Sequence, residues 1–155
     1  MIPPTSSGWL AVAASRDLRR RPLRILHAGR PFVLFREGGA PKALADRCPH
    51  RGALLSAGRL RPDGLECPYH GWRFAGDGRC RAIPGHLGAP PSFNVPTLPA
   101  CEADGLIFLK LGEGEAPPYS CVLRGSGVVS RVARSLVRSS LLDVAENILD
   151  QPLRC

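Results

Sequence analysis

The chain contains 155 residues, carries a formal net charge of +8, and is 44% hydrophobic. This length is typical of one domain, and the apolar content argues against a disordered chain. No apolar run approaches the roughly 20 residues that a membrane-spanning helix needs, and the N-terminal residues lack the apolar core of a secretory signal. We therefore expect a cytoplasmic globular protein with no membrane partner.

The positive charge comes almost entirely from arginine, with 19 Arg and 2 Lys. Two explanations fit this composition: the base composition of the gene, or a docking surface for an acidic partner such as an electron donor. Apart from residues 19–21 the arginines are scattered, and no aromatic ladder or nucleic-acid-binding motif accompanies them. We therefore expect no nucleic-acid partner.

Short apolar stretches separated by turn residues recur over the first 112 residues. With 17 Gly and 16 Pro, the composition favours short strands over a helix bundle. The predicted strands, in chain order, are Trp9 to Ala14, Leu23 to Leu26, Phe32 to Phe35, Ala43 to Ala45, Trp72 to Phe74 and Leu106 to Leu111. Gly and Asp-Gly turns between them predict an antiparallel β-sandwich or small barrel. The proline-rich residues 84–99 are predicted to form an ordered loop that leads to one last strand.

The pattern changes after residue 112. Residues 113–127 are rich in Gly and Pro and are expected to form a linker. From residue 128 onward, apolar residues recur at spacings of three and four with arginines between them, which predicts an amphipathic helix within residues 128–155. We therefore expect three parts: a β-rich domain over 1–112, a linker over 113–127 and a helical segment over 128–155.

Two short segments combine cysteine with histidine: Cys48-Pro49-His50-Arg51-Gly52 and Cys67-Pro68-Tyr69-His70-Gly71-Trp72. Each supplies one thiol and one imidazole from a tight loop. The proline after each cysteine stiffens the loop, and Gly52 and Gly71 permit positive φ. Backbone N–H groups in such loops can point at an anionic cluster.

Two Cys and two His suit either a structural zinc site or a Rieske [2Fe–2S] centre, in which two Cys bind one iron and two His the other. Zinc fingers usually separate the Cys pair from the His pair, whereas each loop here holds one of each. This symmetry favours the two-iron cluster. A disulfide framework is not expected from the six cysteines, because no export signal accompanies them.

The chain resembles the N-terminal Rieske domain of the Rieske non-haem iron oxygenases, the ring-hydroxylating and O-demethylating family. The resemblance covers about residues 9–112, implies a Rieske-type antiparallel β fold, and is nearest to the branch of vanillate O-demethylase and pheophorbide oxygenase. Besides the two loops, it rests on the segments Trp9 to Ala13, Gly29 to Arg36, Ala45 to Arg47, Leu54 to Gly58, Gly78 to Gly85 and Glu102 to Phe108.

This resemblance implies that Cys48 and Cys67 bind one iron of the [2Fe–2S] cluster and that His50 and His70 bind the other. It also implies an electron donor of the ferredoxin or flavin reductase type, and a homotrimer if the chain is full length. Respiratory Rieske proteins carry a serine after His-Gly, where this chain has Trp72. Loss of that hydroxyl donor predicts a potential low in the Rieske range, roughly −150 to 0 mV.

Family members continue into a catalytic domain with a mononuclear Fe(II) held by two histidines and a carboxylate. The segment Glu146-Asn147-Ile148-Leu149-Asp150 resembles the start of that motif, but Leu153 stands where its first histidine is expected, and the last histidine is His86. We therefore expect electron transfer without a mononuclear iron site in this chain, as part of an oxygenase that hydroxylates or O-demethylates an aromatic or polycyclic substrate. The alternatives are a standalone Rieske ferredoxin and a zinc-stabilised interaction domain.

Overall fold

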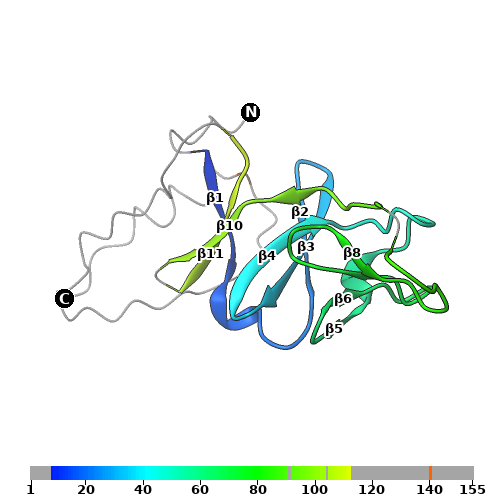
Figure 1. Ribbon diagram of the computed structural model, residues 1–155. Coiled ribbons are helices and arrows are strands. Elements are labelled where there is room, and N and C mark those ends of the chain that lie inside the picture. Colours follow the sequence, from blue (N-terminus) through cyan, green and yellow to red (C-terminus); the bar gives the residue numbers. More distant parts are fainter. Residues whose placement is uncertain (1–7, 91, 104, 113–139, 141–155) are drawn as a thin grey trace, which may run out of the picture.

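A computed structural model describes residues 8–90, 92–103, 105–112 and 140. The strands form three antiparallel sheets, with sheet B between sheets A and C (Figure 1). Across sheet A the order is β1 (Trp9–Ala14), β11 (Leu106–Lys110) and β10 (Ala100–Ala103). Sheet B contains β2 (Leu23–His27), β3 (Arg30–Glu37), β4 (Ala40–Ala45) and β9 (Thr97–Leu98). Sheet C contains β5 (Arg59–Arg61), β6 (Gly64–Glu66), β7 (Arg73–Phe74) and β8 (Cys80–Ala82).

The middle sheet is covered on both faces, which explains the continuous apolar run in β3. Successive side chains of a strand point to opposite faces. Val33 and Phe35 accordingly pack toward sheet C, whereas Leu34 packs toward sheet A. In β4, Leu44 and Ala43 divide in the same way. The fold therefore has two cores, and the one between sheets B and C includes the cysteines of both Cys-His segments.

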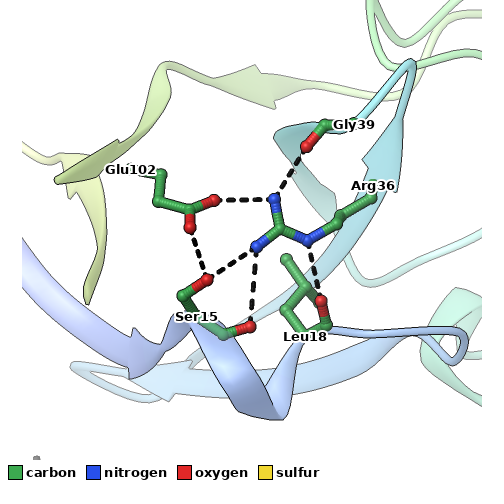
Figure 2. Close-up of polar contacts among 5 residues, drawn as sticks. All are labelled: Ser15, Leu18, Arg36, Gly39 and Glu102. Atoms are coloured by element: carbon green, nitrogen blue, oxygen red, sulfur yellow. Dashed lines mark hydrogen bonds and ion pairs between the residues drawn. The ribbon is translucent and has the colours of Figure 1, made fainter. Parts of the chain in front are cut away.

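A polar cluster around Arg36 ties sheet A to sheet B (Figure 2). Arg36 lies opposite Pro41 at the start of β4, whereas the segment that begins with Cys48 follows the end of that strand. The Arg36 guanidinium donates hydrogen bonds to the carbonyl oxygens of Leu18 (2.8 Å) and Gly39 (2.7 Å). It also donates to Ser15 Oγ (2.9 Å) and pairs with the Glu102 carboxylate (2.6 Å). Ser15 in turn donates to Glu102. Because Ser15 lies in the 3-10 helix η1 (Ser15–Asp17) and Glu102 in β10, one side chain of β3 joins three segments distant in sequence.

The antiparallel β fold predicted from the sequence is confirmed, and β1 begins and ends where predicted. The short strands β5, β6 and β8 were not among the predicted strands. After residue 84 the short strands β9 and β10 precede β11 where one last strand was expected. Apart from residue 140, the predicted linker and C-terminal helix, including Glu146, Asn147 and Asp150, lie outside the described residues. No helix in the described part of the chain has the length and hydropathy needed to cross a membrane.

Candidate metal centre

The two Cys-His segments form loops with the same backbone hydrogen bonds. Loop 1 (residues 48–53) follows β4 and precedes the 3-10 helix η2 (Leu55–Ala57). Its first residue, Cys48, donates its N–H to the Ala53 carbonyl (2.8 Å) and accepts a bond from the Gly52 N–H (2.8 Å). These two bonds close the loop into a compact turn between β4 and η2.

Loop 2 (residues 67–72) connects β6 to β7 and repeats this arrangement. Cys67 donates its N–H to the Trp72 carbonyl (2.7 Å) and accepts a bond from the Gly71 N–H (3.1 Å). Gly52 and Gly71, each the fifth residue of its loop, have φ of +72° and +70°, a conformation that glycine adopts most readily. The positive φ expected from the sequence is thus confirmed. The loops differ in the histidine, which is third in loop 1 and fourth in loop 2.

The two thiols meet on the inner side of the loops. Cys48 and Cys67 are 2% and 3% exposed and belong to the core between sheets B and C. Burial raises the pKa of the Cys48 thiol to about 11, and the adjacent Cys67 thiol raises it further. The backbone N–H groups of His50 and Arg51 lower that pKa, because they donate hydrogen bonds to the Cys48 sulfur. Loop 1 thus aims backbone donors at a sulfur, as expected for a loop that holds an anionic cluster.

The two imidazoles meet on the outer side. The ring centroids of His50 and His70 are 4.7 Å apart with the planes tilted by 56°, and both residues are exposed. The pKa of His50 is lowered by partial desolvation first, and then by the positive charges of His70 and Arg51. Since a neutral imidazole is the form that binds a metal, these neighbours favour the ligating state.

These four side chains fit a group that contains two metal ions. They form a sulfur pair inside and a nitrogen pair outside. A [2Fe–2S] cluster of the Rieske type takes two thiolates on one iron and two imidazoles on the other, so the donor set and its division match that cluster.

Asp46 anchors loop 1, and sequence reasoning missed this role. Among the described residues it is the only buried charged side chain (1% exposed). Its carboxylate accepts hydrogen bonds from the Ser56 N–H (2.7 Å) and Oγ (2.6 Å), and the Arg24 guanidinium lies 3.3 Å away. Because Asp46 precedes loop 1 and Ser56 follows it in η2, these bonds hold the two ends of the loop together. The sequence feature that could have indicated this role is the position of Asp46 directly after the apolar strand β4.

Trp72 also has a contact that its sequence position does not reveal. Its indole stacks on the His50 imidazole, with ring centroids 4.6 Å apart and planes within 5° of parallel. Trp72 closes loop 2 through its carbonyl, so its side chain reaches from one loop to the other. His70, by contrast, stacks on its exposed chain neighbour Tyr69, at 3.8 Å.

The chain is similar to oxygenase components of known function. It is 41% identical over 108 residues to the oxygenase component of chloroacetanilide N-alkylformylase from Rhizorhabdus wittichii (strain DC-6 / KACC 16600), a match that covers 69% of this chain and 31% of the relative. It is 38% identical over 123 residues to the oxygenase component of dicamba O-demethylase from Stenotrophomonas maltophilia, covering 74% of this chain and 36% of that one. The chain thus spans about a third of the length of these curated relatives.

Solved structures agree with the sequence matches. The crystal structure of dicamba monooxygenase with non-heme iron and dicamba superposes with a TM-score of 0.64 at 38% identity, covering 72% of this chain and 35% of that chain. NdmA of Pseudomonas putida CBB5 superposes with a TM-score of 0.67 at 29% identity, covering 74% and 38%. The family model of the Rieske [2Fe-2S] domain matches residues 8–99, which include both loops and more than half of the chain. The shared fold, the duplicate loops and this match together place the chain in the Rieske [2Fe-2S] domain family.

Proposed function

We propose that Cys48 and Cys67 bind one iron of the [2Fe–2S] cluster and that His50 and His70 bind the other. The observation that carries this proposal is the division of the four side chains into a buried sulfur pair and an exposed nitrogen pair on two loops of the same backbone form. Thiolates stabilise ferric iron, so the imidazole-bound iron is the easier one to reduce. The cluster supplies one-electron transfer.

The burial pattern gives the site a buried face and an exposed face. The cysteines face the core, where water is excluded, and both histidines lie at the surface. We infer that His50 and His70 would form the exposed face of the site that a redox partner approaches. The cysteine side of the loops serves to hold the cluster and to keep its sulfurs away from solvent.

Oxygenase components of Rieske systems receive electrons from reductase or ferredoxin partners. For this chain we propose a ferredoxin or flavin reductase as donor, with an acidic docking surface. Arg47 and Arg51 are exposed beside the exposed histidine of loop 1, and opposite charge accelerates the encounter of two proteins. In a full-length protein the assembly would be a homotrimer.

We further propose that the chain is the Rieske part of an oxygenase that hydroxylates or O-demethylates an aromatic substrate. The names of two relatives support this class, since they describe an O-demethylase of dicamba and an N-alkylformylase of chloroacetanilides. The Rieske part would cover residues 1–112, with a linker over 113–127 and the start of a catalytic domain over 128–155. A mononuclear Fe(II) would belong to that further domain.

Metal and sulfide analysis of anaerobically purified protein tests the cluster, together with electron paramagnetic resonance (EPR) after dithionite reduction. We expect about two iron and two sulfide per chain and the rhombic signal of a cluster with mixed Cys and His ligands. Cys48→Ser and His70→Ala are expected to lose the cluster. Cys101→Ser, which changes a half-buried cysteine of β10 outside both loops, is expected to keep it. One zinc per chain without sulfide would overturn the proposal.

A further inference from the structure

Trp72 is a buried residue of loop 2 whose indole contacts the imidazole of His50 in loop 1. By its backbone it belongs to loop 2, because its carbonyl accepts the Cys67 N–H. By its side chain it belongs to loop 1, because its indole lies flat against His50 at 4.6 Å. A shift of either loop relative to the other would therefore disturb this stack.

The indole itself is firmly held. Trp72 is only 9% exposed and packs in the core that contains Cys48 and Cys67. Phe74 lies 6.4 Å from it and Phe93 lies 5.3 Å from it, between ring centroids. Since Phe74 is fully buried in β7, the side chain of Trp72 connects the rigid interior to an imidazole at the surface.

The two histidines consequently differ in their support. His50 stacks on a buried ring that is anchored in the core, whereas His70 stacks on Tyr69, whose side chain is 60% exposed. An exposed ring next to its partner in the chain restricts an imidazole much less than a buried ring from another loop. One face of His50 is also covered by the indole and thereby kept from water.

We propose that Trp72 is a positioning residue for the cluster: it fixes the orientation of the His50 imidazole and shields the imidazole-bound iron from water. This proposal rests on the proposed function, because it takes His50 as a ligand. The expected consequence is a cluster that is held more tightly, with a lower reduction potential, than the same four ligands would give without the indole.

The direction of the potential follows from charge. Two ferric ions, two sulfides, two thiolates and two neutral imidazoles sum to zero, so addition of one electron gives a cluster of charge −1. Water stabilises the charged form more than the neutral form, and solvent exposure is one of the factors that set the potential of these clusters. Removal of the indole admits water beside His50. Reduction then becomes easier and the midpoint potential rises.

The test compares Trp72→Phe, Trp72→Leu and Trp72→Ala in the cluster-loaded protein with Trp9→Phe as the matched control. Trp9 is also a buried tryptophan, but it lies in β1 of sheet A. We measure the midpoint potential, the EPR g values and the rate of cluster loss, each beside the melting temperature. For Trp72→Ala we expect about a tenfold shift of the reduction equilibrium toward the reduced form, which is 59 mV for a one-electron couple. We also expect altered g values and faster cluster loss, in smaller measure for Trp72→Phe.

The melting temperature separates positioning from plain packing. Trp9→Phe is expected to lower it and to leave the potential and g values unchanged. If the Trp72 variants also lower only the melting temperature, or if their potential falls, the inference is wrong. Should Trp72→Ala not fold, Trp72→Phe and Trp72→Leu decide the matter by the same readouts. Failure of the parent protein to bind any [2Fe–2S] cluster would instead overturn the proposed function, so the two failures are distinguishable.

Discussion

Loop 1 and loop 2 close with the same pair of backbone hydrogen bonds, yet they are attached to the fold by different chemistry. Loop 1 is held at its base by a buried carboxylate, Asp46, which accepts two hydrogen bonds from Ser56. Loop 2 is held by apolar contacts: Trp72 packs in the core, and the Pro84 ring lies against Gly71. The two loops thus share one backbone conformation, but a polar contact attaches loop 1 to the fold and apolar contacts attach loop 2.

The two kinds of support fail in different ways. Removal of one partner from a buried polar contact leaves the other without compensation in a region that excludes water, and this costs more than the contact itself contributes. An apolar support depends instead on volume, so it is disturbed by added atoms as well as by lost ones. Loop 1 should therefore be sensitive to charge, and loop 2 to shape.

The largest effect is expected at Asp46. Asp46→Ala leaves the Ser56 N–H and hydroxyl without their acceptor and should destabilise the protein by about 3 kcal/mol. Asp46→Asn keeps an acceptor oxygen at the site, so we expect a smaller loss. The matched control is Asp63→Ala, which removes a carboxylate paired with Arg73 at 2.8 Å on an exposed surface and should cost less than about 1 kcal/mol.

Denaturant unfolding of the three variants at equal cluster loading measures these costs. The rate of cluster loss should follow the same order, because Asp46 joins the residues that flank loop 1, whereas Asp63 pairs with Arg73 outside that loop. Equal costs for Asp46→Ala and Asp63→Ala would contradict the assignment of Asp46 as the anchor of that loop.

A second comparison uses the glycine that each loop carries at its fifth position. Alanine at positive φ costs about 1 kcal/mol in either loop. A Cβ on Gly71 would lie 3.0 Å from Pro84 Cγ, in a ring that cannot turn aside. A Cβ on Gly52 would lie 3.3 Å from Arg47 Nε, in an exposed side chain that can move. We therefore expect about 1 kcal/mol for Gly52→Ala and about 2 kcal/mol for Gly71→Ala, measured by denaturant unfolding; the reverse order would show that loop 2 is not the shape-sensitive one.

Features of the fold that depend on residues close together in the chain could be predicted from the sequence, whereas features that depend on distant residues could not. The loops were predictable because their turns are local: a proline after each cysteine and a glycine three residues later specify the backbone within six residues. The long strands were predictable from their apolar runs, β3 above all. The strands β5, β6, β8, β9 and β10 were not, since two to four residues without alternation carry no recognisable pattern.

The supports of the site were beyond sequence reasoning because they join distant residues. Arg24, Asp46 and Ser56 come from β2, the end of β4 and η2, and no local pattern marks them as partners. His50 and Trp72 come from different loops, and their stack depends on how sheets B and C pack. Trp72 drew notice in the sequence only as the residue in place of a serine, which predicted its effect on potential but not its contact with His50.

The smallest effect is expected at the Arg36 cluster, which supports neither loop and so calibrates the comparison (Figure 2). The hydrogen bond from Arg36, and then that from Ser15, hold the pKa of Glu102 below its ordinary value of 4.5.

A carboxylate whose pKa is lower in the folded state stabilises the fold above its unfolded pKa, and this contribution is lost as the pH falls through the folded value. Glu102→Gln should therefore lower the melting temperature near pH 7, and the gap to the parent should narrow as the pH falls below 4.5 and close once it has fallen through the lower folded-state pKa. Since the Glu102 side chain is 34% exposed and screened by solvent, the loss should stay under about 1 kcal/mol. The EPR signal near neutral pH should not change, because Arg36 lies opposite the start of β4, whereas loop 1 follows the end of that strand. If the difference in melting temperature persisted in acid, Glu102 would stabilise the protein through packing rather than through charge. A changed EPR signal would mean that the Arg36 contacts are coupled to the metal centre.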